Sequence, residues 1–86
     1  MKQFTYTVTN EIGIHGRPAA ELTKFVKGFA STVTIEKEGK APVNATALMK
    51  LMLLGVACGD TVKVTVTGAD EEQAAKALEE YMTKNL

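Results

Sequence analysis

Four stretches of the chain have the pattern of β-strands, and in three of them apolar and polar side chains alternate. Residues 4–8 alternate between large apolar side chains and threonines, a period of two that is typical of a half-buried strand. The same alternation returns at residues 32–36 and, most clearly, at residues 61–67, where valines face one way. Residues 41–44 could form a short returning strand, but Pro42 cannot donate a backbone hydrogen bond. We therefore expect this stretch to be an irregular edge strand.

Three other stretches have apolar residues at helical spacing. In residues 16–28, Pro18 suits the first helical turn, and the apolar stripe comprises Ala19, Leu22, Val26 and Phe29. A short helix is predicted over residues 45–55, where either Asn44 or Thr46 could be the N-cap. The last helix begins near Asp70, its predicted N-cap, with Gln73 as the capping-box partner.

The order of these elements is β-α-β-β-α-β-α, without an internal repeat or a linker. Strands with one polar and one apolar face favour an antiparallel sheet that helices cover on one side. The prediction is an α+β fold, an open-faced β-sandwich with a four-stranded antiparallel sheet and three helices on one face. Residues 1–86 are expected to form a single domain.

Composition excludes several classes of function. Ten basic and ten acidic residues cancel, which disfavours nucleic acid as the main partner. The single cysteine, Cys58, is expected to be at least half-buried without a role, and it allows neither an internal disulfide nor a thiol metal cluster. No stretch resembles a signal peptide or a membrane span, which favours the cytoplasm. No metal site, cofactor or nucleotide-binding loop is expected.

The candidate chemistry lies in residues 13–18, Gly-Ile-His-Gly-Arg-Pro, where the first strand gives way to the first helix. His15 is the only histidine and Arg17 the only arginine of the chain. A neutral imidazole can attack phosphorus, and the backbone N–H groups of Gly16 and Arg17 could bind phosphate at the helix start. Arg17 adds donors suited to phosphate oxygens. Spacing alone allows equally that His15 is an ordinary exposed loop residue.

Residues 13–20 resemble the active-site signature of HPr, the histidine-containing phosphocarrier family of the bacterial phosphoenolpyruvate:sugar phosphotransferase system (PTS). The likeness extends along the chain through residues 39–40, 48–51, 54–55 and 68–71. It implies a carrier, not an enzyme, that takes a phosphoryl group on Nδ1 of His15 from phospho-enzyme I. The carrier would pass this group to the IIA domains of sugar permeases, with Arg17 stabilising it during transfer.

The sequence departs from this family at a regulatory position. Many Gram-positive members carry a serine at the start of the short helix, which HPr kinase phosphorylates, and the aligned residue here is Ala47. Thr46 lies one residue earlier and could cap the helix instead. We therefore expect no HPr-kinase modification at Ala47. One extra residue, near residues 41–42, also departs from the commonest family pattern.

The short helix has more apolar residues than one buried stripe requires. Met49 and Leu53 are expected to point outward, whereas Met52 could serve either the core or the surface. Pattern alone equally allows a fully buried helix, but the resemblance implies docking of enzyme I and IIA domains through the first two helices. The expected positive rim comprises Arg17, Lys24, Lys27 and Lys50. The acidic last helix is expected to lie away from the site, and a transient carrier is expected to be monomeric.

Two alternatives stay open at this point. The chain could be the nitrogen-branch paralogue of the same carrier, which uses the same histidine with a different enzyme I and IIA. It could also be a small α+β regulatory or binding module in which His15 carries no phosphate.

Overall fold

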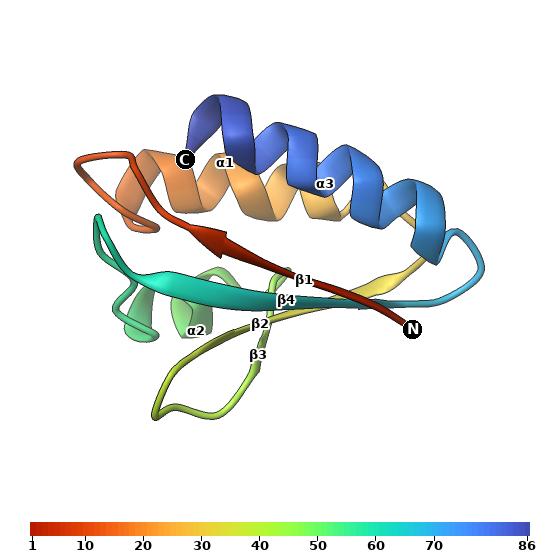
Figure 1. Cartoon of the computed structure of the whole chain (residues 1–86), viewed down its shortest axis with the longest axis horizontal. Helices are drawn as coiled ribbons and strands as arrows, with labels where there is room; N and C mark the ends of the chain where they lie inside the picture. The colour runs from red at the N-terminus through yellow and green to blue at the C-terminus, as the bar shows by residue number, and fades with distance from the viewer.

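The computed structural model describes residues 1–86 and contains the seven elements in the predicted order. These are β1 (Lys2–Thr7), α1 (Gly16–Val26), β2 (Thr32–Lys37), β3 (Val43–Asn44), α2 (Leu48–Leu53), β4 (Thr61–Thr67) and α3 (Glu71–Asn85). Helices α1 and α3 lie side by side over the sheet, as Figure 1 shows. The rings of Phe25 and Tyr81 stack between the two helices, with centroids 4.3 Å apart.

The sheet is antiparallel throughout, with the strand order β1-β4-β2-β3. Val64 of β4 lies at its centre, opposite Phe4 of β1 on one side and Ile35 of β2 on the other. Strand β3 has two residues and pairs only with β2, through Val43 opposite Ile35. The predicted α+β open-faced fold is confirmed, as is the irregular edge strand after Pro42.

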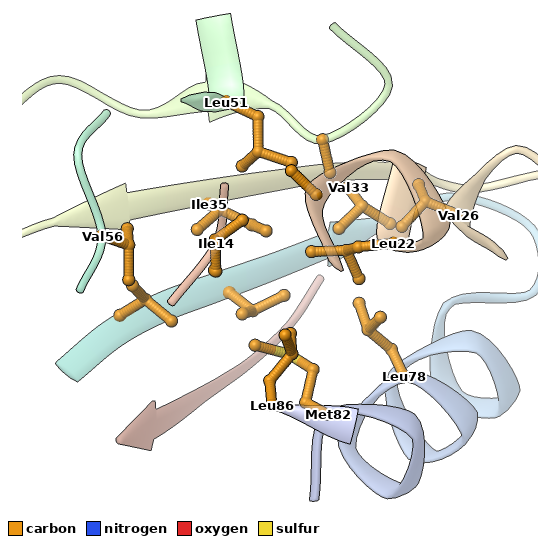
Figure 2. Packing of buried hydrophobic residues seen from close by; sticks show 14 of the residues in the cluster. Ile14, Leu22, Val26, Val33, Ile35, Leu51, Val56, Leu78, Met82 and Leu86 are labelled. Carbon is orange, nitrogen blue, oxygen red and sulfur yellow. The ribbon is translucent and has the colours of Figure 1, made fainter. Parts of the chain in front are cut away.

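The buried side chains of the sheet and of all three helices form one hydrophobic cluster. The valines of β4 are fully buried, whereas the threonines and Lys63 between them are exposed or half-buried. Leu22 of α1, Leu51 of α2 and Leu78 of α3 are each fully buried against this face (Figure 2). Burial of such side chains stabilises a fold by about 1.5–3 kcal/mol each, so this cluster is the main source of stability. None of the helices has the length and hydropathy needed to cross a membrane.

The first two helices are shorter than predicted. Helix α1 ends at Val26 instead of residue 28, because its last turn tightens and Gly28 N–H donates to the Phe25 carbonyl (3.1 Å). Helix α2 begins at Leu48, with Ala47 as its N-cap, so neither proposed capping residue caps it. The side-chain oxygen of Asn44 instead accepts hydrogen bonds from the backbone N–H (2.9 Å) and hydroxyl (2.7 Å) of Thr46. This local turn delays the start of the helix.

The predicted capping box of α3 is wrong. Asp70 occupies the N-cap position, but its side chain makes no capping hydrogen bond. Its carboxylate accepts hydrogen bonds from the backbone N–H of Ala30 (3.0 Å) and from the Ser31 hydroxyl. Glu71 accepts the Gly68 N–H (3.2 Å), so Gln73 is not the residue that reaches back. Asp70 therefore joins the start of α3 to the α1–β2 loop.

Candidate functional site

His15 stands exposed at the start of α1. It occupies the N-cap position with an extended backbone (φ −152°, ψ 153°). The imidazole makes no capping hydrogen bond, so neither ring nitrogen is used to hold the helix start. The only histidine of the chain is thus exposed to solvent.

Gly16 shapes the backbone that follows His15. Its φ of +60° lies in the left-handed region, which glycine adopts without the steric cost that other residues carry. No atom lies within 4 Å of the place where a Cβ would be, so the space beside Gly16 is open. The first N–H groups of a helix have no acceptor within the helix. The N–H groups of Gly16 and Arg17, at the start of α1, therefore have no acceptor within the helix.

The loop that carries His15 is anchored by its preceding residues. Ile14 is fully buried, and its N–H donates to the Val56 carbonyl (3.0 Å). Gly13 has a φ of +78°, and a Cβ there would lie 2.4 Å from the Val56 oxygen and 2.8 Å from the Ala57 Cα. Only glycine allows the two backbones to approach this closely. The exposed His15 therefore follows a residue that is fixed in the core.

The loop after α2, residues 55–60, is fixed in turn by an ion pair that sequence reasoning missed. Lys37 of β2 donates to the Gly55 carbonyl (2.8 Å) and pairs with Asp60 (3.0 Å). The Ala57 N–H donates to Asp60 (2.8 Å), and this bond, followed by Lys37, holds the pKa of the Asp60 carboxyl below its usual range. These contacts hold the segment against which Gly13 and Ile14 pack.

Arg17 is turned to its own helix. Its Nε donates to Glu21 Oε1 (3.2 Å), one turn along α1, and its side chain is 90% exposed. Both residues border a hollow of about 360 Å³ between α1 and α3, which also includes Tyr81, whereas His15 does not line it. Arg17 is thus close to His15 in sequence, but its guanidinium is bonded to Glu21 and lies beside a hollow that His15 does not line.

The last helix does not lie wholly away from the site, contrary to the sequence-based expectation. Its acidic first turn packs by the α1–β2 loop, but Asn85 at its other end borders the hollow beside Arg17. The Leu86 carbonyl accepts the backbone N–H groups of Thr9 (2.6 Å) and Asn10 (2.7 Å). The end of α3 is thus a further support for the loop before His15.

The predicted docking face is exposed on α1 and α2. Met49 and Leu53 are 67% and 76% exposed, while Met52 is half-buried. The lysines of the predicted rim, Lys24, Lys27 and Lys50, are all exposed. Ile12, in the loop before His15, is a further apolar side chain that is 62% exposed and that sequence reasoning missed.

The structure places three other residues considered in the sequence analysis. Cys58 is exposed, not buried, because the loop from residue 57 to residue 59 lies at the surface. Ala47 is half-buried and immediately precedes α2. The hydroxyl of Thr46 is exposed and donates to Asn44.

Comparisons with known proteins agree with this geometry. The family model of the PTS HPr component phosphorylation site matches residues 2–84. The chain is similar to a crystal structure of HPr from Thermoanaerobacter tengcongensis, with a TM-score of 0.92, 40% identity, and coverage of 99% of this chain and 94% of that chain. It is similar to phosphocarrier protein HPr from Bacillus anthracis, with a TM-score of 0.87, 34% identity, and coverage of 94% and 95%. An HPr dimer from T. tengcongensis matches with a TM-score of 0.74, 40% identity, and coverage of 98% and 95%.

Proposed function

Because this chain belongs to the PTS HPr family, we propose that it accepts a phosphoryl group on His15 from phospho-enzyme I and passes it to IIA domains of sugar permeases. The observation that carries the proposal is the exposed, unengaged imidazole at the start of α1, on a loop anchored at Ile14. The protein acts as a carrier with a transient phosphohistidine, without a cofactor or metal of its own.

The transfer needs only the groups at this helix start. The lone pair of His15 Nδ1 attacks phosphorus, and the N–P bond forms as the bond to the donor breaks. The proton on Nε2 stays in place, so no separate base is required. The N–H groups of Gly16 and Arg17 and the positive end of the helix dipole stabilise the phosphoryl oxygens. The Arg17 guanidinium supplies a further charge-assisted donor.

Incubation with enzyme I and phosphoenolpyruvate tests the central step. We expect an acid-labile mass gain of one phosphate in the native chain and none in His15→Ala. Because His15 is exposed and makes no capping bond, His15→Ala should fold normally, which circular dichroism can verify. Absence of a mass gain in the presence of a competent enzyme I would exclude the carrier function and favour the regulatory or binding module.

We propose that enzyme I and the IIA domains dock on one face of α1 and α2. The exposed apolar side chains Met49 and Leu53, with the edge of Met52, would form its centre, and Lys24, Lys27 and Lys50 its positive rim. Apolar centres with polar rims are typical of protein interfaces, and lysines steer acidic partners. The Thr23 hydroxyl donates to the Ala45 carbonyl (3.1 Å), which ties α1 to the segment before α2.

The sugar branch is the leading assignment, and the nitrogen branch is its alternative. Transfer assays with the enzyme I of each branch separate them, since phosphate should appear faster with the sugar-branch enzyme. The reverse preference would favour the nitrogen branch.

We propose that kinase control through the short helix is absent. Ala47 lacks a hydroxyl, and the Thr46 hydroxyl is engaged with Asn44. Incubation with HPr kinase and ATP should leave the mass unchanged, and phosphate on Thr46 would contradict the proposal.

We further propose a cytoplasmic monomer, the state suited to brief encounters with several partners. Light scattering across a concentration series should give the mass of one chain. A constant doubled mass would instead place this chain with dimers such as the one from T. tengcongensis.

A further inference from the structure

Glu21 holds the one arginine of the chain. The Arg17–Glu21 hydrogen bond (3.2 Å) is the only ion pair that the guanidinium makes, and the Glu21 side chain is 54% exposed. Both side chains border the hollow between α1 and α3, and His15 does not. Glu21 also lies near Tyr81, whose pKa is raised by burial and, secondly, by the charge of Glu21. Arg17 is therefore engaged by its own helix, beside the hollow that α3 also borders.

The Arg17–Glu21 ion pair is a weak interaction. Both partners are exposed, so water and salt screen their attraction. The arginine precedes the glutamate, which is the less favourable order for an ion pair on a helix. The first turn of α1 contains no acidic residue, so Arg17 adds positive charge to the positive end of the helix dipole. The local field at this helix start thus favours an arriving anion over the existing pair.

A phosphoryl group on His15 would be such an anion. It carries nearly two negative charges and three acceptor oxygens, and it would lie at the helix end where negative charge is favoured. Glu21 takes only the Nε–H of Arg17 and leaves the other N–H donors free, but the single positive charge of Arg17 would be shared between Glu21 and the phosphoryl group. This sharing raises the free energy of the phosphorylated form relative to the free form.

We propose, building on the phosphocarrier function above, that Glu21 is a positioning residue that sets how readily His15 gives up its phosphoryl group. It holds Arg17 in the unphosphorylated protein and competes for it in the phosphorylated protein. The competition makes phosphohistidine a better donor to the next protein without changing the transfer chemistry.

An exchange equilibrium measures this directly. Phosphorylated ¹⁵N-labelled native protein is mixed with an equal amount of unlabelled variant and a catalytic quantity of enzyme I, and phosphate in each is read by mass. Glu21→Gln should hold the phosphoryl group about two- to fivefold more strongly than the native chain at low salt. The preference should approach one in 1 M NaCl, because an exposed pair is screened.

Two matched variants separate the role of Glu21 from a general charge effect. Glu11→Gln removes the same charge from the loop four residues before His15 and should change the equilibrium less than Glu21→Gln. In an Arg17→Gln background, Glu21→Gln should lose most of its effect, because its action passes through Arg17. An effect that persists without Arg17, or no effect of Glu21→Gln on the native background, would overturn the inference. If the native chain forms no phosphohistidine, the carrier function itself fails.

Discussion

The two glycines that flank His15 and Ile14 have different reasons to be glycine. Gly16 needs a left-handed backbone but has open space beside it, whereas Gly13 needs the same backbone and also lies against Val56. The first requirement concerns only backbone strain. The second also concerns a close contact: with a Cβ at residue 13, that residue and the segment at Val56 could not both stay in place.

Alanine substitutions should separate these costs. Gly16→Ala should lower the free energy of unfolding by about 1–2 kcal/mol, the cost of a left-handed non-glycine residue. Gly13→Ala should cost more, about 3 kcal/mol or above, because a Cβ 2.4 Å from the Val56 oxygen forces the backbone to move. Urea denaturation of both variants measures the difference. Equal costs would mean that the Gly13 contact relaxes freely.

At the scale of elements, side chains from distant segments join the helices and loops. Asp70 connects the start of α3 to the α1–β2 loop across 39 residues of sequence. Its pKa is held below the ordinary value of 3.8 by the Ser31 hydroxyl and, secondly, by the Ala30 N–H. The ionised carboxylate is therefore the form that the folded state favours.

This connection predicts a stability that depends on pH. A folded-state pKa below the unfolded one contributes stability that is present above the unfolded value and is lost as pH falls through the folded value. The native protein should thus lose stability as pH falls below about 4. Asp70→Asn should be less stable at neutral pH and should have a flatter profile on acidification. Urea denaturation from pH 2 to pH 7 measures both, and parallel profiles would exclude a role for Asp70.

The elements show which features could be predicted from sequence. Strand β4 and helix α1 were predictable because their periodic side chains lie within one short segment. The His15 motif was predictable because its residues are consecutive and its glycine and proline have local conformational meaning. The roles of Asp70, Lys37 and Glu21 were not predictable, because each depends on which partner a flexible or distant side chain meets after packing.

At the scale of the whole molecule, a net charge of zero conceals a separation of charge. The α1 and α2 segments carry the exposed Lys24, Lys27 and Lys50, whereas α3 carries the exposed Glu72, Glu79 and Glu80 beside Lys76 and Lys84. Such a separation orients an approaching acidic partner without requiring a net positive protein.

Variants on the docking face should weaken binding without unfolding the protein. Leu53→Ser should reduce affinity for enzyme I roughly tenfold, by removing apolar contact area, and should change stability by less than about 0.5 kcal/mol.

Lys27→Gln should reduce the association rate about two- to threefold at low salt and have little effect at high salt. Lys76→Gln is the matched control, because Lys76 is exposed on α3, outside the proposed face. Stopped-flow association measures the rates, and equal effects of the two lysines would contradict the proposed face.

The strand order has a consequence for how the chain is made. Strand β4 lies between β1 and β2, yet it is the last strand in the sequence. As the chain leaves the ribosome, β1 has no strand to pair with until residues 61–67 have emerged. Until then β2 can pair only with the two residues of β3. A nascent chain that stops before β4 therefore exposes the apolar faces of both strands. The segment that presents His15 can be fixed in place only after nearly the whole chain has been synthesised.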